Sequence, residues 1–344
     1  MKIAYGIAGE GRGHATRAEA VIDHLLQHHK VSIFAGDRAA LYFKSKKYQV
    51  IPLSCLRIAY QNNSVSGFGT LLFNILRTPL YLYDFAKLVI ILLRLKPDIL
   101  ITDFNFLCSY AALLLGIPLI TLDNQHVITK TKYALEKKWF FEQWKSKIVI
   151  HFVVPKAKKY LITTFFHVKK KSKNIVTLPP LIRKEVRALQ PKKGNHVFVY
   201  QTSQTNMQLL KDLKSLKLPC VIYGFDKQRK EGSLHFKKSQ DTYFEDLASA
   251  KAVILNGSFT TMTEAIFLKK PIFSIPVQHQ FEQIFNGIHL QKLGLGMMQN
   301  ISSQKALKYF LSHLSFYEKN LKKMNIPYTS AFPLIDQELK KWQK

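Results

Sequence analysis

Short β-rich runs alternate with amphipathic stretches along most of the chain, and this alternation limits the possible folds more than any other feature. In the first half, helical patterns such as Arg17–His28 and Phe106–Leu115 separate the runs. Strands are predicted at Lys2–Gly6, Val31–Ala35, Gln49–Leu53, Ile99–Thr102, Leu119–Leu122, Ile148–Val153 and Ile175–Leu178. Strands that alternate with helices form mainly parallel sheets with helices on both faces. Residues 1–180 are therefore predicted to form a doubly wound α/β domain.

The pattern breaks once and then restarts, which predicts a second domain over residues 196–325. Residues 181–195 contain a proline, several basic residues and a Gly-Asn pair, and we interpret them as a linker. Further strands are predicted at Val197–Gln201, Cys220–Phe225, Ala252–Leu255 and Pro271–Ile275, and helices at Asn206–Ser215, Tyr243–Ala250, Thr260–Phe267 and Gln280–Lys292. Residues 326–344 include a last helix at Leu334–Trp342, for which packing back on the first domain is an open alternative. Parallel sheets bind ligands beyond the carboxyl ends of their strands, so two such domains predict an interdomain cleft.

The chain is strongly basic, with 51 Lys and Arg against 22 Asp and Glu and a formal net charge of +29. Such an excess favours polyanionic partners, namely nucleic acid, an anionic membrane or a phosphate-bearing substrate. A solvated basic surface explains the excess equally well. Because no motif of nucleic-acid-binding proteins occurs, we expect no nucleic-acid partner, and a basic nucleic-acid-binding protein remains the weaker alternative.

Several features are typical of a cytoplasmic protein. The three cysteines lie far apart among apolar residues, as reduced core thiols do. No signal-peptide pattern is visible, and charged residues interrupt the most apolar stretch, residues 78–95. Residues 68–95 nevertheless combine leucines and aromatics with basic side chains, as helices that bind anionic lipid do. Peripheral association with the inner face of the membrane and an ordinary buried helix pair are both left open.

The first predicted strand runs into the sequence GEGRGH, which has three glycines and a histidine. Gly9, Gly11 and Gly13 permit positive φ and let the backbone approach a ligand, and Arg12 adds a charge. The free amides of the next helix, expected to begin one or two residues after His14, favour an anion. His14 is a candidate general base, because imidazole titrates near neutral pH. The alternative is that His14 only orients the loop.

Polar side chains also follow three predicted strands of the second half. Hydroxyl groups and a carboxylate begin a helix within NGSFTTMTE (256–264), and capping is the simple interpretation. Glu264 lies too far inside the helix to cap it, and a carboxylate there can accept hydrogen bonds from ribose hydroxyls. Amides and an acid follow in PVQHQFEQ (276–283). Upstream, Thr202, Ser203 and Thr205 are placed to hold phosphate oxygens together with helix amides.

Several well-known motifs are absent from the sequence. It contains no D-x-D, no G-x-x-x-x-G-K-[ST], no H-E-x-x-H and no G-x-S-x-G. A metal-clamped nucleotide-sugar site, a P-loop enzyme, a zincin and a standard serine hydrolase are therefore disfavoured. We expect neither a metal ion nor a cofactor.

The motifs GEGRGH, PDILITDFNFLCSYAALLLGIPLITLDNQH (97–126) and the stretch 244–296 resemble those of glycosyltransferases of the GT-B fold. The likeness is to the MurG-like branch, which includes the N-acetylglucosaminyltransferase of peptidoglycan lipid synthesis. It implies two Rossmann-like domains, of which the second binds a nucleotide diphosphate sugar, most often a UDP-sugar. A UDP-sugar 2-epimerase of the same fold is the alternative.

The resemblance also implies roles for individual residues. Glu264 would hold the ribose, Ser203 a phosphate, and Phe244 would flank the uracil. Ser258, Thr260 and Thr261 would face the diphosphate, and Glu282 and Gln283 would read the donor sugar. On the acceptor side the resemblance implies a loop made of Gly9, Gly11, Arg12, Gly13 and His14.

The resemblance implies an inverting, metal-independent transfer in which a base takes the proton of an acceptor hydroxyl. His14 and Asp103 are both candidates for this base, and His126 is a further one that the sequence does not rank against His14. For Asp103 the alternative is a helix N-cap. The acceptor is not identified, and a lipid-linked or cell-envelope glycan acceptor is one open possibility.

Overall fold

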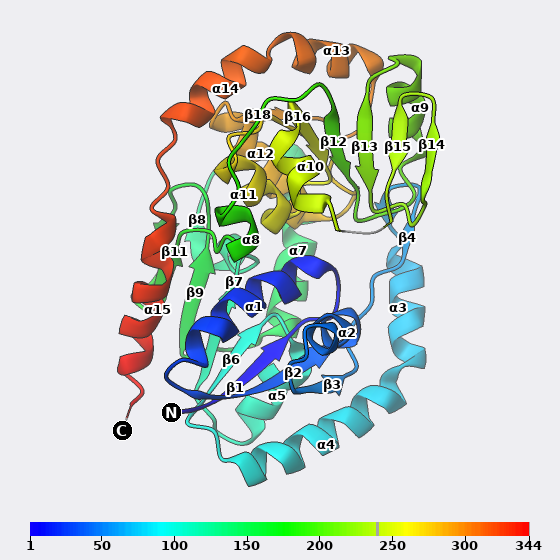
Figure 1. Ribbon diagram of the computed structural model, residues 1–344. Helices are drawn as coiled ribbons and strands as arrows, with labels where there is room; N and C mark the ends of the chain where they lie inside the picture. Colours follow the sequence, from blue (N-terminus) through cyan, green and yellow to red (C-terminus); the bar gives the residue numbers. More distant parts are fainter. Residues whose placement is uncertain (239–240, 344) are drawn as a thin grey trace. The chain divides into compact units, whose positions relative to one another are not determined.

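The computed structural model describes residues 1–238 and 241–343, and it divides into two compact units (Figure 1). Unit 1 consists of Met1–Ala59, Gly67–Leu181 and Pro327–Lys344. Unit 2 consists of Tyr60–Ser66 and Ile182–Ile326. The residues interpreted above as a linker thus lie almost wholly within unit 2, and so does a seven-residue segment from the first half of the chain.

Unit 1 contains a seven-stranded parallel sheet in the order β11-β9-β7-β6-β1-β2-β3. Its strands are β1 (Lys2–Ile7), β2 (Lys30–Gly36), β3 (Val50–Leu53), β6 (Ile99–Asp103), β7 (Leu119–Asp123), β9 (Lys159–Thr163) and β11 (Ile175–Leu178). The chain builds outward from β1 in one direction and then from β6 in the other. Ligands of doubly wound sheets bind beside such a reversal, at the carboxyl ends of the strands.

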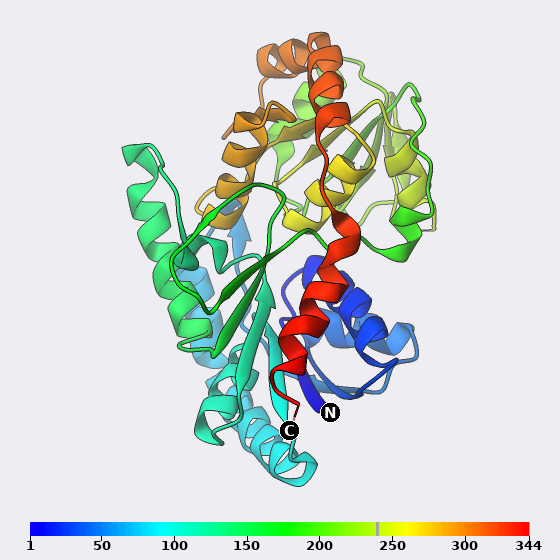
Figure 2. The same ribbon diagram turned by 90° about the vertical axis from the view of Figure 1, so that its left-hand side faces the viewer.

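Helices cover both faces of this sheet. They are α1 (Arg12–Leu25), α2 (Asp37–Ser45), α3 (Gly67–Leu76), α4 (Thr78–Leu95), α5 (Phe106–Leu114), α6 (Val127–Lys130), α7 (Phe140–Val153) and α15 (Ala331–Lys340), with 3-10 turns at Lys137–Trp139 and Tyr328–Ser330 and a small ladder of β8 (Thr131–Lys132) and β10 (Lys169–Lys170). The last helix, red in Figure 2, buries Ala331, Ile335 and Leu339 in the same core as α1. Among the described residues, no helix combines the length and apolarity needed to span a bilayer.

Two expectations about unit 1 are wrong. Ile148–Val153 is not a strand but the last part of α7, whose apolar residues continue a helical pattern from Phe140, and the sheet instead takes in β9. Ile148, Val149 and Phe152 are exposed, which a central strand would not allow. Helix α1 begins at Arg12 rather than after His14, because Gly11 adopts φ 78° and serves as its N-cap residue.

Unit 2 repeats the architecture with a sheet in the order β14-β15-β13-β12-β16-β17-β18. All neighbours are parallel except β14 and β15. The strands are β12 (Val197–Tyr200), β13 (Cys220–Tyr223), β14 (Arg229–Glu231), β15 (Leu234–Phe236), β16 (Ala252–Leu255), β17 (Ile272–Ser274) and β18 (Gly296–Met298). The helices are α8 (Lys184–Arg187), α9 (Met207–Ser215), α10 (Tyr243–Ser249), α11 (Phe259–Phe267), α12 (Phe281–Lys292), α13 (Gln304–Ser312) and α14 (Leu314–Lys323). The reversal lies between β12 and β16. The short hairpin of β4 (Tyr60–Gln61) and β5 (Ser64–Val65) completes the unit.

Candidate functional site

In unit 1, polar residues meet at the carboxyl ends of β1, β6 and β7, beside the reversal of the sheet. The Ala8 amide donates to the Asp103 carbonyl oxygen (2.9 Å), which ties the end of β1 to the end of β6. The loop from Gly9 to Gly11 then turns directly into α1, so His14 lies in the first turn of that helix. Arg12 is the first helical residue.

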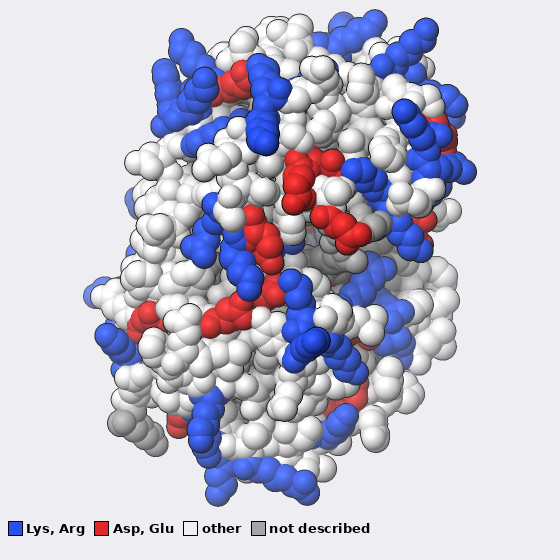
Figure 3. Space-filling view, viewed as in Figure 1, with Lys and Arg blue, Asp and Glu red and all other residues white. Residues whose placement is uncertain are grey.

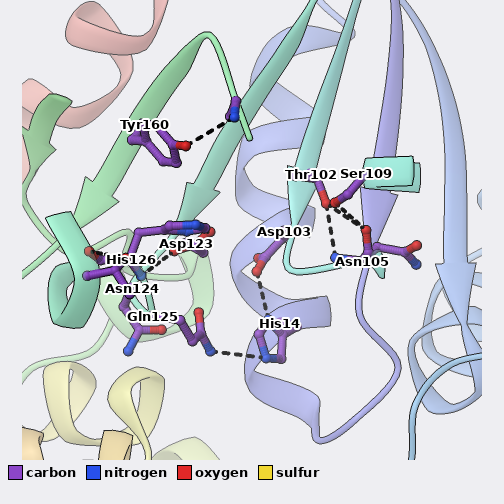
Figure 4. Close-up of polar contacts among 12 residues, drawn as sticks. His14, Thr102, Asp103, Asn105, Ser109, Asp123, Asn124, Gln125, His126 and Tyr160 are labelled. Carbon is purple, nitrogen blue, oxygen red and sulfur yellow. Dashed lines mark hydrogen bonds and ion pairs between the residues drawn. The ribbon is translucent and has the colours of Figure 1, made fainter. Parts of the chain in front are cut away.

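His14 and Asp103 form the centre of this group (Figure 4). His14 Nδ1 lies 2.7 Å from Asp103 Oδ1, and Gln125 Nε2 lies 3.5 Å from the other imidazole nitrogen, Nε2. The His14 side chain keeps 15% of its surface exposed, whereas Asp103 is fully buried. The carboxylate therefore fixes the imidazole through Nδ1, and Nε2 faces the Gln125 side chain.

Arg17, one turn along α1, completes the group. Its Nε and Nη2 donate to the two oxygens of Asp103 at 2.9 and 2.6 Å, and its Nη1 donates to Asn124 Oδ1 at 3.2 Å. Burial alone would raise the pKa of the Asp103 carboxyl, but the neighbouring Arg17 and His14 outweigh burial and hold that pKa below its usual value. Asp103 is thus held ionised with both oxygens engaged, which suits an orienting group better than a base.

The helix-capping alternative for Asp103 is wrong. The N-cap of α5 is Asn105, whose side-chain oxygen accepts a hydrogen bond from the Cys108 amide at 3.0 Å. Asn105 also donates through Nδ2 to the Ile7 carbonyl oxygen, so one amide side chain serves both β1 and α5. Asp103 is left for His14 and Arg17.

His126 forms a second histidine–carboxylate pair at the end of β7. Its Nδ1 lies 2.7 Å from Asp123 Oδ2, its amide donates to Asp123 Oδ1, and its ring packs 4.9 Å from that of Tyr160. Only 1% of the His126 side chain is exposed. The His126 imidazole is thus almost fully buried, whereas the His14 imidazole keeps part of its surface exposed.

In unit 2, most of the residues predicted for the donor lie in the loops after β12 and β16 or in the helices α11 and α12, which follow β16 and β17. Ser203 Oγ and Thr205 Oγ1 lie 2.6 Å apart in the first loop. Asn256, at the start of the second loop, accepts from the Thr202 amide and donates to Gln201 Oε1 at 2.9 Å. These amide contacts tie the first two loops to each other.

The first turn of helix α11 carries hydroxyl groups, and just before it the backbone at Gly257 lies close to the backbone at Gln283. Gly257 has φ 90°, and a Cβ there would lie 2.7 Å from the Gln283 carbonyl oxygen, so only glycine fits. Ser258 is the N-cap residue but makes no side-chain capping hydrogen bond, contrary to the capping interpretation. Thr260 and Thr261 lie in the first turn and are largely buried.

Glu264 is fully buried in α11 and carries a bidentate ion pair. Arg183 donates from Nε and Nη2 to the two Glu264 oxygens at 2.5 and 2.6 Å. The guanidinium carbon lies 4.5 Å from the ring centre of Phe244, the residue predicted to flank the base. The structure therefore brings the predicted ribose and base residues together around one arginine.

The two residues predicted to read the donor sugar lie in the first turn of α12. Gln283 is buried, and its Oε1 accepts a hydrogen bond from the Val277 amide at 2.9 Å. Its side-chain carbonyl thus supports the loop after β17. Glu282 is partly exposed.

Sequence reasoning missed Arg17 and Arg183. The position of Arg17 could have indicated its role, because residues three positions apart share one face of a helix and Arg17 follows His14 by three positions. Arg183 has no local signal, since it lies in the stretch interpreted as a linker. The burial of a carboxylate such as Glu264 requires a cation but does not tell which one.

No group of three or more His, Cys, Asp and Glu side chains within the described parts of the chain is arranged to hold a metal ion. Metal independence stays a prediction.

Comparison with known proteins shows a family to which the chain is similar. The family described as Glycosyl transferase family 1 matches residues 1–315. An uncharacterized glycosyltransferase of Methanosarcina acetivorans is 25% identical over 338 residues, covering 88% of this chain and 86% of that protein.

Solved structures that share the fold include the following two. The calicheamicin glycosyltransferase CalG4 superposes with a TM-score of 0.67 at 13% identity, over 99% of this chain and 98% of the other. Phytolacca americana UGT2, solved with UDP-2fluoro-glucose and pterostilbene, gives a TM-score of 0.66 at 15% identity, over 96% and 94%.

Proposed function

Because the chain belongs to Glycosyl transferase family 1 and is a glycosyltransferase of the GT-B fold, we propose that it transfers a sugar from a UDP-sugar to a hydroxyl acceptor with inversion. The observation that carries this proposal is the His14–Asp103 pair at the reversal of the unit 1 sheet. An imidazole held through one nitrogen by an ionised carboxylate, with its second nitrogen not bound to that carboxylate, is the group that proton removal from a hydroxyl needs.

The mechanism follows from the state of each group. The acceptor hydroxyl would lose its proton to His14 Nε2 while its oxygen attacks the anomeric carbon. The bond from that carbon to the diphosphate breaks, and the diphosphate leaves with the electron pair. Asp103 would stabilise the imidazolium that forms, and Arg17 would keep Asp103 ionised. Because the oxygen attacks from the side opposite the leaving group, the anomeric configuration inverts.

Unit 2 supports the donor part of the proposal. The start of α11 offers backbone amides and the uncommitted Ser258 side chain to a diphosphate. The Glu264 carboxylate can accept hydrogen bonds from both ribose hydroxyls once Arg183 no longer donates to the two Glu264 oxygens. A nucleotide diphosphate donor agrees with the UDP-2fluoro-glucose held by the solved Phytolacca americana enzyme.

A thermal-shift screen with nucleotide sugars tests this proposal. At ligand concentrations about 100 times the dissociation constant, binding stabilises the folded state by about 2.7 kcal/mol, which raises the unfolding temperature by several degrees. We expect UDP and at least one UDP-sugar to give this shift in EDTA as well as in magnesium. The dTDP- and GDP-sugars serve as comparisons. No shift with any nucleotide diphosphate would refute the donor assignment, and a shift that needs magnesium would refute metal independence.

We further propose a MurG-like role, in which the acceptor is lipid-linked and the protein works at the membrane surface. Neighbouring helices of unit 1 leave many large apolar side chains exposed: Phe68, Leu71, Leu72, Phe73, Ile75 and Leu76 on α3, Leu80, Leu82, Tyr83, Ile90 and Leu93 on α4, Tyr110, Leu113 and Leu114 on α5, and Phe140, Phe141, Trp144, Ile148, Val149 and Phe152 on α7. Only the α3–α4 part was predicted. Basic residues on these helices, among them Arg94 and Lys145, suit anionic lipid.

Sedimentation with vesicles tests the membrane proposal. We expect the protein to pellet with vesicles that contain phosphatidylglycerol at low salt, and to stay in solution with neutral vesicles or at high salt. The Phe141→Ser/Trp144→Ser double variant should partition at least tenfold more weakly, because burying each aromatic side chain is worth about 1.5–3 kcal/mol. Phe316→Ser is the matched control, since Phe316 is an equally exposed aromatic on α14 of unit 2. Wild-type protein that stays in solution with anionic vesicles would contradict the proposal.

The alternatives named above receive less support. The family and the solved relatives are glycosyltransferases, which does not favour a 2-epimerase. On the face seen in Figure 3, Lys and Arg are scattered among uncharged residues rather than gathered into one stripe. A scattered distribution is not what recognition of a nucleic-acid backbone requires.

A further inference from the structure

The hairpin Tyr60–Ser66 lies in unit 2, although the chain on both sides of it belongs to unit 1. Its two strands are joined by Asn62 and Asn63, both with positive φ (49° and 55°), as a two-residue type I′ turn requires. Hairpin tips usually face solvent. Here Asn62 is exposed but only 7% of the Asn63 surface is, so one residue of the turn is inserted into the unit.

Asn63 contacts the loops after β12, β16 and β17; the first two carry Ser203 and Ser258, and the third leads into α12 with Glu282 and Gln283. Its amide donates to Thr205 Oγ1 at 2.7 Å, in the loop after β12. Its side-chain oxygen lies 3.5 Å from Asn256 Nδ2, after β16, and its Nδ2 lies 3.4 Å from the Pro276 carbonyl oxygen, after β17.

The hairpin also pairs with the loop after β17. The Gln278 amide donates to the Asn63 carbonyl oxygen at 2.8 Å, and the Val65 amide donates to the Gln278 carbonyl oxygen at 3.0 Å. This loop leads into α12, where Glu282 and Gln283 lie. A single inserted turn thus braces the loop from which the proposed sugar-reading residues continue.

The direction of the hydrogen bonds matters for the phosphate residues. A backbone amide can only donate, so Thr205 Oγ1 is the acceptor of the Asn63 bond. Ser203 Oγ accepts from the Thr205 amide at 3.3 Å, and when the Thr205 hydroxyl donates along the 2.6 Å contact as well, both acceptor sites of Ser203 Oγ are used and its proton is left for another acceptor. A hydroxyl proton in that position suits a phosphate oxygen.

We infer that Asn63 is a positioning residue for the donor, which braces the three loops and sets Ser203 as a hydrogen-bond donor to the diphosphate. The inference rests on the proposed function, because it takes unit 2 as the part that binds the nucleotide diphosphate. Asn63 does not touch the reacting atoms. It acts through Thr205, Asn256 and the loop after β17.

Paired glycine variants of the turn test this inference. Asn63→Gly keeps positive φ and the backbone contacts but removes the side chain between Asn256 and Pro276. Asn62→Gly makes the same change at the exposed neighbour and is the matched control. We expect Asn63→Gly to raise the UDP dissociation constant and the donor KM about three- to tenfold, the range expected for lost side-chain hydrogen bonds, with kcat and acceptor KM unchanged. Asn62→Gly should bind UDP as the wild type does.

Thr205 gives an independent arm, in which Thr205→Val removes the hydroxyl at nearly constant shape and Thr205→Ser restores it. We expect weaker UDP binding in the valine variant and near-normal binding in the serine variant. Equal UDP affinity of Asn63→Gly and Asn62→Gly would overturn the inference, and so would a lower unfolding temperature of Asn63→Gly without a change in affinity. Tighter binding would mean that the hairpin obstructs the donor and would overturn it too. Failure of the wild type to bind any nucleotide diphosphate would instead count against the proposed function.

Discussion

Replacing His14 by alanine is expected to lower the turnover number by a factor of about 10² to 10⁴, the range that a positioned general base contributes. UDP affinity should stay within about twofold of the wild-type value, because His14 lies in unit 1 and the proposed donor residues lie in unit 2. Turnover is measured as UDP release from the UDP-sugar that the thermal-shift screen selects, in the presence of a panel of hydroxyl acceptors. Calorimetry with UDP measures the affinity.

The same helix offers a matched control for this variant. His24 also lies on α1 and also pairs with a carboxylate, because its Nε2 is 2.8 Å from Asp336 Oδ1, but it lies away from the carboxyl ends of the strands. We expect His24→Ala to turn over at nearly the wild-type rate. Wild-type turnover in His14→Ala, or an equal loss in both variants, would remove His14 as the base.

Asp103→Asn extends the argument from the base to its support. It keeps the shape of the side chain but removes the charge that fixes the imidazole, so turnover should fall while His14 is intact. The change also leaves the buried Arg17 guanidinium without a carboxylate partner. Breaking such a buried ion pair lowers the free energy of unfolding by about 3–5 kcal/mol. A loss of turnover together with a lower unfolding temperature is therefore expected, which separates Asp103 from His14, whose replacement should affect turnover alone.

The sequence predicted most of the two sheets because their central strands are apolar runs bounded by turns. It failed at Ile148–Val153, where β-branched and aromatic residues favour a strand but lie on a helix that buries only Ile150 and Val153 of this run. It also missed β9, a largely buried strand of five residues, and the short strands β14, β15 and β18, which are three residues long each. Periodicity cannot be recognised in so short a run.

For the candidate site, the sequence predicted which residues are polar at strand ends, but not which of them meet. His14 and Asp103 were both named as alternatives for one role, whereas the fold pairs them across 89 positions of sequence. Asn63 was missed although two asparagines between short runs are a hairpin signal. Insertion of that turn into the other half of the chain depends on tertiary contacts that no local pattern encodes.

Replacing Glu264 by alanine is expected to weaken UDP binding about 100-fold. Two hydrogen bonds from ribose to a buried carboxylate would be lost, and bonds to charged groups are worth about 1.5–3 kcal/mol each, partly offset because Arg183 must first yield the oxygens. Glu264→Gln keeps the volume and one carbonyl acceptor, so its loss should be smaller. Calorimetry with UDP measures both variants. The control is Glu318→Ala, which breaks an exposed ion pair with Lys193 in the same unit and should leave UDP affinity unchanged.

The Arg183–Glu264 ion pair can be tested through stability: we expect Arg183→Ala to lower the free energy of unfolding more than Glu264→Ala does. Arg183 keeps 12% of its side chain exposed and can turn its guanidinium to solvent when Glu264 is removed, whereas Glu264 is fully buried. Arg183→Ala therefore leaves a buried carboxylate without a cation. It should lower the free energy of unfolding by about 3–5 kcal/mol, more than Glu264→Ala. Denaturant unfolding of the two variants measures this difference. Unchanged UDP affinity in Glu264→Ala would refute the ribose assignment whatever the stabilities. A Glu264→Ala variant less stable than Arg183→Ala would refute the account of the ion pair but leave the donor assignment standing, because the two measurements depend on different states of the same carboxylate.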